Sequence, residues 1–403
     1  MIMDFPTLHS QQEQTQDYLS RHERLSAQEV RFVVSPYRIC PIGAHVDHQG
    51  GTVLGKTINA YTVLAFAPLM TSDVRLYSLN YPQLTAFQLN QIGPPDFTQW
   101  GRYACGAAQV LNQHTGFKLK VGLVGALTGT LPGSGLSSSA SVGLAYLHAL
   151  AAVNGIELTA AEFVELTRQL ENDYLGLDNG IQDQTTISYA QEGKLVHMDS
   201  RTRAVKLVDD GPNVDHCRII IAYSGYSREL TSTGFNVRVH ECWQAAKWLG
   251  EQAGIANAKI LSDIPHDIYE AYRDGLPVPL RRRTAHYFTE VGRVEAGAEA
   301  WAQGDITRFG TLMTESCHSS IHNYESGSEA LRLMNQIVST TEGVYGSRFS
   351  GGGYGGCVVG LVDAVYAEEA VKTIEAQYLQ ALPETRGQAA IYLAETEGCV
   401  RVV

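Results

Sequence analysis

The sequence predicts an α+β protein of two or at most three domains, and three observations support this prediction. Runs of β-branched and aromatic residues predict strands in the first third and at the end of the chain. Long segments with the helical spacing of apolar residues separate these runs. A length of 403 residues, with 44% hydrophobic and 18% charged residues, is typical of a folded protein with substantial cores.

The first domain is predicted to cover residues 1–212 and to mix strands with helices. Strands are predicted at 31–34, 52–69, 74–78 and 119–124, interrupted by turns at Asn80-Tyr81-Pro82 and Gly93-Pro94-Pro95. Helical spacing predicts helices at 97–113, 138–153 and 160–174. Short strands at 194–198 and 205–208 then precede the turn Asp210-Gly211-Pro212, where we place the domain boundary.

The second domain is predicted to cover residues 213–403. It begins with a buried strand at 218–223, and helices dominate from 234 to about 341. The chain is predicted to end as strand, helix and strand, at 355–362, 365–382 and 389–394.

Charge and composition exclude several classes of partner. A net charge of −12, without runs of lysine or arginine, argues against nucleic acid and against an anionic membrane. The first residues lack the order of a signal peptide, and no apolar run is long enough for a membrane span, so we expect a cytoplasmic chain. The seven scattered cysteines favour reduced thiols. We expect a monomer or a weakly associated homodimer.

A glycine-rich turn that runs into a helix is the most informative segment. In PGSGLSSSAS, Gly133 and Gly135 allow the backbone to approach a ligand, and Ser137 to Ser139 lie where a helix begins. A helix start of this kind attracts anions, so the segment predicts a phosphate cradle. The alternative is an ordinary capped helix, which would suffice to explain a single serine.

Two other segments match nucleotide-binding patterns but lack the context that those patterns need. GGTVLGKT, from Gly50 to Thr57, fits a P-loop, yet a strand rather than a helix is predicted after it. We therefore interpret Lys56 as a surface lysine. The glycines of SGGGYGG fit a dinucleotide fingerprint, but CVVGLV after them is also a predicted strand.

The segment SPYRICPIGAHVDHQGG gathers Arg38, His45, Asp47 and His48 between a predicted strand and a double glycine. A transition-metal site would need three ligands within four residues, which is an unusual backbone. A plain polar turn is a second interpretation. Recognition of a polyol is the third and the preferred one, because Asp and His supply paired acceptors and donors for adjacent hydroxyls.

The segment ENDYLGLDNGIQDQ carries a helix end, a glycine turn and a second acid. Glu171, at the end of an amphipathic helix, would by itself indicate only a solvated face. Asp183 lies at a possible helix start, where it is either an N-cap or a carboxylate well placed to stay ionised beside a substrate hydroxyl.

These segments resemble the motifs of the GHMP kinases, and within them the galactokinase branch. PYRICPIGAHVDHQGG, PGSGLSSSAS and SRFSGGGYGGC are similar to the three family motifs in the family's order, and GIQDQ and LTSTGFNVR also match galactokinase segments. The first motif is most similar to that of the galacturonic acid kinases. The resemblance implies an N-terminal α/β domain like ribosomal protein S5, a ferredoxin-like C-terminal domain and an active site between them.

Site roles follow from the resemblance alone. It implies that ATP and Mg²⁺ are bound, with Ser139 and Glu171 as metal ligands, and that Asp183 is the catalytic base assisted by Arg38. His45, Asp47 and Gly180 would contact sugar hydroxyls. One loop would wrap the ATP phosphates and comprises Pro132, Gly133, Ser134, Gly135, Leu136, Ser137, Ser138 and Ser139. A second loop, with Gly352 and Gly353, would support it.

Departures from the galactokinase motifs point to the substrate. Galactokinases have a glutamate in contact with the C6 hydroxyl where this chain has Ala44, and Phe235 replaces a sugar-binding tyrosine. Ala44 removes a charge that would repel a uronate, so we expect 1-phosphorylation of D-galacturonate, with Arg228 or Arg238 as candidate partners of its carboxylate. The alternatives are a galactokinase, an arabinokinase, or a sugar-sensing regulator without catalysis.

Overall fold

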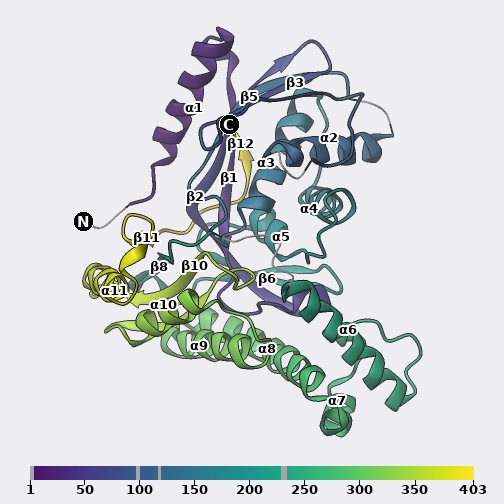
Figure 1. Ribbon diagram of the computed structural model, residues 1–403, viewed down its shortest axis with the longest axis vertical. Coiled ribbons are helices and arrows are strands. Elements are labelled where there is room, and N and C mark those ends of the chain that lie inside the picture. Colours follow the sequence, from purple (N-terminus) through teal and green to yellow (C-terminus); the bar gives the residue numbers. More distant parts are fainter. Residues whose placement is uncertain (1–3, 97–99, 117–118, 228–233) are drawn as a thin grey trace.

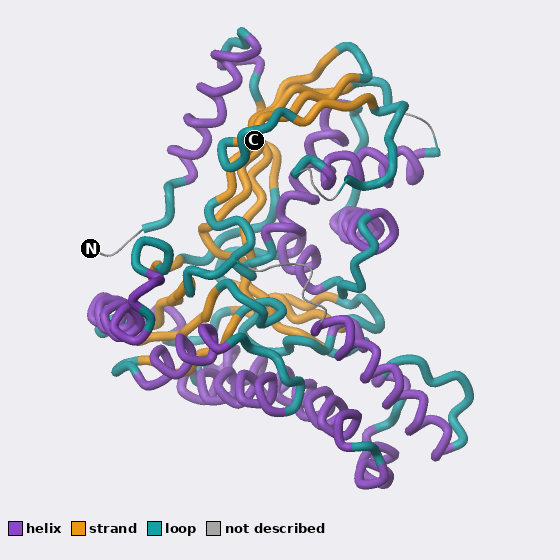
Figure 2. Tube along the Cα trace, in the orientation of Figure 1, coloured by secondary structure: helices purple, strands orange, loops and turns teal. Residues whose placement is uncertain are grey.

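Two sheets organise the computed structural model, which describes residues 4–96, 100–116, 119–227 and 234–403 (Figures 1 and 2). The strand order of the first sheet is β12-β1-β2-β5-β3-β4, and β6 and β7 extend it from the other end of β2. Its strands are β1 Arg31–Ile39, β2 Thr52–Leu69, β3 Asp73–Ser78, β4 Thr85–Gln88, β5 Gly122–Gly129, β6 Lys194–Asp199, β7 Val205–Asp209 and β12 Arg401–Val402.

Helices cover both faces of the first sheet (Figure 1). Successive residues of β2 point to opposite faces, so Leu64 packs in the core with α2 and α3, and Ala65 packs against Leu19 of α1. The helices of this half are α1 Leu8–Glu23, α2 Arg102–Thr115, α3 Ser138–Val153, α4 Ala160–Arg168 and α5 Gln182–Tyr189. Helix α3 is apolar on all sides and is accordingly buried.

The second sheet has the order β11-β8-β10-β9, and all its pairs are antiparallel. Its strands are β8 Cys217–Tyr223, β9 Val344–Phe349, β10 Cys357–Asp363 and β11 Ala390–Ala394. Helices α6 Gly234–Ala253, α7 His266–Tyr272, α8 Val278–Gln303, α9 Ile306–His322 and α10 Glu329–Thr340 lie between β8 and β9, and α11 Ala367–Ala381 follows β10. This order confirms the ferredoxin-like prediction.

One hydrophobic cluster joins the two halves. Ile39 and Leu54 of the first sheet pack in the same cluster as Val294 of α8, Phe309 of α9 and Val359 of β10. The last strand, β12, returns to pair with β1. The boundary between residues 212 and 213 stays a prediction.

The long strand β2 contains the segment that fits a P-loop. A strand in that position confirms that GGTVLGKT lacks the helix of a P-loop. The interpretation of Lys56 as a surface residue is wrong, because its side chain is 3% exposed and its Nζ lies 2.7 Å from Oδ1 of Asp210. Trp301 donates a hydrogen bond to the same carboxylate oxygen. Lys56 therefore ties β2 to the segment that links the two sheets.

Most predicted elements are confirmed, and the errors have local causes. The strand at 52–69 and the helix at 138–153 have the predicted bounds, whereas the strand predicted at 119–124 lies at Gly122–Gly129. Strand β1 continues beyond 34 through a register shift at Pro36, so Arg38 lies on a strand. Helix α1 was missed because its sequence is mostly polar. Strands β4, β9 and β12 were also missed.

The start of helix α2 and the absence of a membrane span were also predicted. Residues 97–99 of the helix predicted at 97–113 lie outside the described residues, and α2 begins at Arg102. Within the described ranges, we find no helix with the length and hydropathy needed to span a membrane.

Candidate active site

One arginine side chain connects the start of α5 with the two glycine-rich loops, at Gly135 and at Ser350. Arg38, on β1, contacts Asp183 in the first turn of α5, with its Nη2 2.7 Å and its Nε 2.8 Å from Oδ1. Its Nη1 donates to the carbonyl of Gly135 at 3.3 Å and to the hydroxyl of Ser350 at 3.2 Å. Arg38 is 4% exposed, so the guanidinium is a fixed positive charge at the centre of the site.

The two glycine-rich loops touch each other through their backbones. Gly135 has a φ of 78°, and a Cβ on it would lie 2.9 Å from the carbonyl oxygen of Ser350. In return, a Cβ on Gly351 would lie 2.8 Å from the carbonyl oxygen of Gly135. Only glycine fits such an approach. In the first loop, the hydroxyl of Ser138 accepts a hydrogen bond from the N–H of Gly133, so the turn is closed onto the start of α3.

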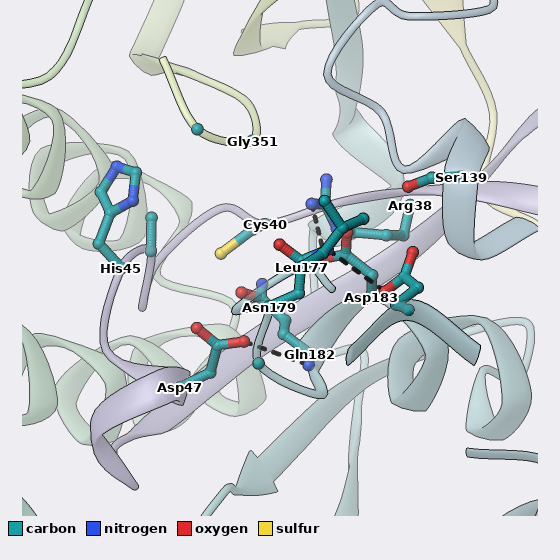
Figure 3. Close-up of a pocket in the computed structure, with 14 residues that line it drawn as sticks. Arg38, Cys40, His45, Asp47, Ser139, Leu177, Asn179, Gln182, Asp183 and Gly351 are labelled. Atoms are coloured by element: carbon teal, nitrogen blue, oxygen red, sulfur yellow. Dashed lines mark hydrogen bonds and ion pairs between the residues drawn. The ribbon is translucent and has the colours of Figure 1, made fainter. Parts of the chain in front are cut away.

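A cavity lies at the meeting point of these segments (Figure 3). Figure 3 shows Asp183 and Arg38 side by side on one side of it, with Ser139 beyond them and His45 and Asp47 on the other side. The residues that line the cavity are Arg38, Cys40, Ala44, His45, Asp47, Ser139, Glu171, Leu177, Asn179, Gly180, Gln182, Asp183, Gly351 and Gly352.

Asp47 is the second carboxylate with a special environment. Burial raises its pKa to about 6, and the charge of Asp183 adds to this rise. The N–H of Gln182 donates to its Oδ2 at 3.3 Å. A Cβ on Gly180 would lie 1.9 Å from the same oxygen, so the carboxylate fits only because residue 180 is glycine. The site thus holds two acids in different environments, one paired with Arg38 and one beside Gly180 and Gln182.

His48 does not join its neighbours as a metal ligand. Its Nε2 lies 3.1 Å from the hydroxyl of Tyr324, and the amide of Gln49 lies 2.8 Å from its Nδ1. Burial lowers the pKa of His48 to about 3, so its ring is neutral. Among the described residues, no group of three or more His, Cys, Asp or Glu side chains is placed to hold a metal ion. The geometry thus gives no support to the transition-metal interpretation.

A second cavity of about 540 Å³ adjoins the first through Ser139. Its lining combines the glycine-rich loop at Pro132, Gly133 and Ser138 with aromatic side chains. The rings of Tyr81 and Trp100 lie nearly parallel in it, with centroids 6.4 Å apart. This aromatic lining was not predicted, since Tyr81 stood out only as part of a turn. Two nearly parallel aromatic rings beside the glycine-rich loop suit a planar ring system.

Comparison with known proteins identifies the family. The family model described as the GHMP kinases N terminal domain matches residues 102–191, and the GHMP kinases C terminal model matches residues 298–380. A galacturonokinase of Arabidopsis thaliana is 41% identical over 399 residues, covering 93% of this chain and 94% of that protein. The chain belongs to the GHMP kinases.

Other relatives place the chain in the galactokinase branch of the GHMP kinases. A galactokinase of Streptococcus mutans is 31% identical over 376 residues, which cover 92% of this chain and 93% of that protein. The crystal structure of Lactococcus lactis galactokinase complexed with galactose superposes with a TM-score of 0.88 and 26% identity, covering 97% of this chain and 99% of that one. The two-domain fold is confirmed, and the chain is a sugar kinase of an ATP-dependent family.

The structure brings together most of the residues that resemble the GHMP kinase site. Nine of them line the first cavity: Arg38, Ala44, His45, Asp47, Ser139, Glu171, Gly180, Asp183 and Gly352. Pro132, Gly133 and Ser138 line the second cavity, whereas Ser134, Gly135, Leu136, Ser137 and Gly353 line neither. Arg228 lies outside the described residues, as does the side chain of Phe235. Arg238 pairs with Glu241 and Glu325 and lines neither of these two cavities.

A magnesium ion fits the donor set at Ser139 and Glu171. Both side chains line the cavity next to Asp183, and a hydroxyl and a carboxylate are oxygen ligands of the kind that Mg²⁺ prefers. Glu171 is 2% exposed and lies on a π-helical turn, Gln169–Tyr174, that extends α4. It is therefore not the solvated face residue that its helical position alone would indicate.

Several lining residues were missed as functional residues. Asn179 donates a hydrogen bond to Oε2 of Glu171 at 3.4 Å, and Leu177 and Cys40 complete the wall. The turn GLDNG carried a signal for Asn179, because a polar residue next to a glycine in a loop is often functional. Cys40 stood out only as a departure from the galactokinase motif, and Leu177 carried no signal, since apolar residues usually indicate packing.

Proposed function

We propose that this sugar kinase transfers the γ-phosphate of ATP to the anomeric C1 hydroxyl of D-galacturonate, giving galacturonate 1-phosphate and ADP. The observation that carries the proposal is Ala44, which lines the cavity beside His45. Galactokinases have a glutamate at this position. A second carboxylate about 4 Å from that of a uronate would cost about 4 kcal/mol at an effective dielectric constant near 20, roughly a thousandfold in affinity. The similarity to the Arabidopsis galacturonokinase supports the same substrate.

The nucleotide and the sugar would occupy the two adjoining cavities. We place the base of ATP against Tyr81 and Trp100, and its phosphates on the loop that contains Gly133 and Ser138. The sugar would lie in the first cavity, where Asp47, His45 and Gly180 would contact its hydroxyls. Ser139 belongs to both cavities, so the γ-phosphate and the C1 hydroxyl would meet there.

In the proposed reaction, the C1 hydroxyl of the sugar would give its proton to Asp183 and receive the γ-phosphoryl group from ATP. Both contacts from Arg38 go to Oδ1 of Asp183, so Oδ2 is available to take the proton of the C1 hydroxyl. The resulting oxygen nucleophile would form a bond to the γ-phosphorus while the bond from that phosphorus to the β,γ-bridging oxygen of ATP breaks, which releases ADP. Arg38 would stabilise the charge that develops. A magnesium ion held by Ser139 and Glu171 would neutralise phosphate charge.

A coupled assay of ADP release tests the proposal directly. Galacturonate, glucuronate, galactose and arabinose are supplied in turn with ATP and Mg²⁺. We expect the highest kcat/KM with galacturonate. A clear preference for galactose or arabinose would overturn the substrate assignment, and no release with any of the four would favour a regulator that binds sugar without catalysis.

A further inference from the structure

The loop Gly43–Ala44–His45 has a backbone that needs support from elsewhere in the fold. Gly43 has a φ of 101° and His45 a φ of 63°. Left-handed conformations are disfavoured for residues with a Cβ, so an isolated chain would rarely hold His45 in this shape. The contacts that hold it therefore decide where Ala44 and His45 face the cavity.

Helix α8 holds this loop through two side chains spaced four residues apart. The N–H of Gly43 donates to Oε1 of Glu290 at 2.7 Å, and Nε2 of His286 lies 2.9 Å from the carbonyl oxygen of Ala44. Residues at this spacing share one face of a helix. The two bonds hold the peptide groups on both sides of the Gly43–Ala44 pair.

The hydrogen-bond partners of His286 fix its tautomer. The carbonyl of Ala44 can only accept, so the proton of the neutral ring is on Nε2. The bare Nδ1 then accepts from the hydroxyl of Ser319 at 3.0 Å. Burial lowers the pKa of His286 to about 4, so the ring is neutral around pH 7 and keeps this arrangement.

Glu290 is a fixed, charged acceptor. Its side chain is fully buried; burial raises the pKa of the carboxyl, but its neighbours His286, Arg293 and Arg348 lower it below the usual range. Arg293 Nε lies 2.7 Å from Oε2, and Arg348 Nη1 lies 3.6 Å from Oε1. An ionised acceptor makes a stronger hydrogen bond to the Gly43 N–H than a neutral one.

The side chain of His45 is also held from the second half of the chain. The ring of Tyr324 stacks on the imidazole with centroids 4.3 Å apart and planes 4° apart. The hydroxyl of Ser326 lies 3.4 Å from Nε2 of His45. Both residues follow α9, so the backbone and the side chain of the loop are set by segments that pack behind it.

We propose that His286 and Glu290 are positioning residues for sugar recognition, which act by fixing the backbone of Gly43, Ala44 and His45. They do not line the cavity, so they would act through the loop and not by contact with the sugar. The inference rests on the proposed function only in that this loop binds the sugar. It holds for whichever sugar the enzyme prefers.

The test compares two replacements of His286 with a control on the same helix. His286→Phe keeps an aromatic ring but removes the donor to Ala44, whereas His286→Gln can supply an amide donor in its place. Thr284→Val is the control, because Thr284 is buried on α8 and its hydroxyl donates to the carbonyl of Arg281. For each variant, KM for the preferred sugar, KM for ATP, kcat and Tm are measured.

We expect His286→Phe to raise the sugar KM at least about tenfold and to leave the KM for ATP within about twofold, since small misplacements of binding groups are costly. His286→Gln should recover most of the loss, and Thr284→Val should lower Tm without changing the sugar KM. If His286→Phe does not fold, Ser319→Ala replaces it, with a smaller rise expected.

Three outcomes would overturn the positioning role: an unchanged sugar KM in His286→Phe, equal rises for sugar and ATP, or the same rise in Thr284→Val. Each requires an active wild-type enzyme. A wild type inactive with every sugar would instead contradict the proposed function, so the two failures are distinguishable.

Discussion

The two loops that form the site obtain their shapes in different ways. The glycine-rich loop from Pro132 to Ser139 closes on itself, since the hydroxyl of Ser138 accepts from the N–H of Gly133 and α3 starts directly after the turn. Arg38 and the backbone at Ser350 then contact the closed loop at Gly135. The loop from Gly43 to Asp47 is held by α8, through partners 242 and 247 positions away. The first loop thus combines a local closing bond with distant contacts, whereas the backbone of Gly43 and Ala44 in the second depends on side chains of α8.

This difference separates the chemistry of the two loops as well. The phosphate cradle needs backbone N–H groups and small residues, which a short segment can supply alone. Sugar recognition needs side chains at set angles, including a partly buried acid, Asp47, that would be unstable without its surroundings. Substitutions should therefore affect phosphate transfer, sugar choice and metal binding separately.

The largest effect is expected at Asp183, which Arg38 joins to the two glycine-rich loops at Gly135 and Ser350. Asp183→Asn keeps the shape of the side chain but removes the proton acceptor, so kcat should fall by about 10²–10⁴-fold. Nucleotide binding should persist, because the aromatic cavity and the cradle are unchanged. Single-turnover kinetics and ATP binding by calorimetry measure the two quantities. A variant that keeps more than about a tenth of the wild-type kcat would show that Asp183 is not the base.

A change at Ala44 tests only the loop from Gly43 to Asp47, the proposed sugar loop. Ala44→Glu should lower kcat/KM for galacturonate by about 10²–10³-fold, which corresponds to the repulsion of two carboxylates about 4 Å apart. Galactose should be spared or improved, because its C6 hydroxyl can donate to the new acceptor. Competition between the two sugars in one ADP-release assay measures the ratio. Equal losses for both sugars with an unchanged Tm would contradict the charge argument, whereas equal losses with a lowered Tm would indicate a folding defect.

The contrast between the loops explains what could be predicted from the sequence. The phosphate cradle, the helix after it and the strand of β2 follow local rules of glycine, serine and β-branched residues, so their bounds were predicted closely. The positions of Asp183 and Arg38 were indicated by their motifs. Their contact across 145 positions was expected only from the resemblance to a family.

What could not be predicted depends on tertiary packing. Nothing in the local sequence of α8 distinguishes His286 or Glu290 from other polar residues of an amphipathic helix, and their partners lie in another domain. Lys56 was misread for the same reason, because the acid that neutralises it lies 154 positions away. The aromatic cavity likewise gathers Tyr81 and Trp100 from separate segments.

The proposed magnesium ligands, Ser139 and Glu171, line the first cavity next to Asp183, and their loss should have an intermediate effect. Ser139→Ala and Glu171→Gln should each raise the Mg²⁺ concentration for half-maximal rate by about tenfold, with the larger shift for Glu171→Gln because it also removes a charge. Lys56→Met is the matched control. It breaks a buried ion pair, so Tm should fall, but ATP affinity should stay within about twofold. Loss of ATP binding in Lys56→Met would mean that GGTVLGKT is a phosphate loop after all.

The smallest effect concerns pH and the sugar loop. The pKa of Asp47 is raised to about 6, so its carboxylate is ionised above that pH and would accept hydrogen bonds from the hydroxyls of a bound sugar, whereas below that pH one oxygen carries a proton. Sugar affinity should therefore weaken by up to about tenfold between pH 7 and pH 5. A raised pKa also means that folding favours the protonated form, so this group's contribution to stability declines as pH rises through 6. Asp47→Asn should flatten the affinity profile and raise Tm above pH 6.

Asp183 allows this assignment to be tested further. Its negative charge is one cause of the raised pKa of Asp47, after burial. In Asp183→Asn that charge is absent, so the midpoint of the affinity profile should move to lower pH while the profile keeps its shape. Sugar binding without nucleotide, followed by calorimetry from pH 4.5 to pH 8, measures the midpoint in both proteins. A midpoint that stays in place, or moves to higher pH, would show that another group titrates, and Asp47 and Asp183 would then have to be treated as independent.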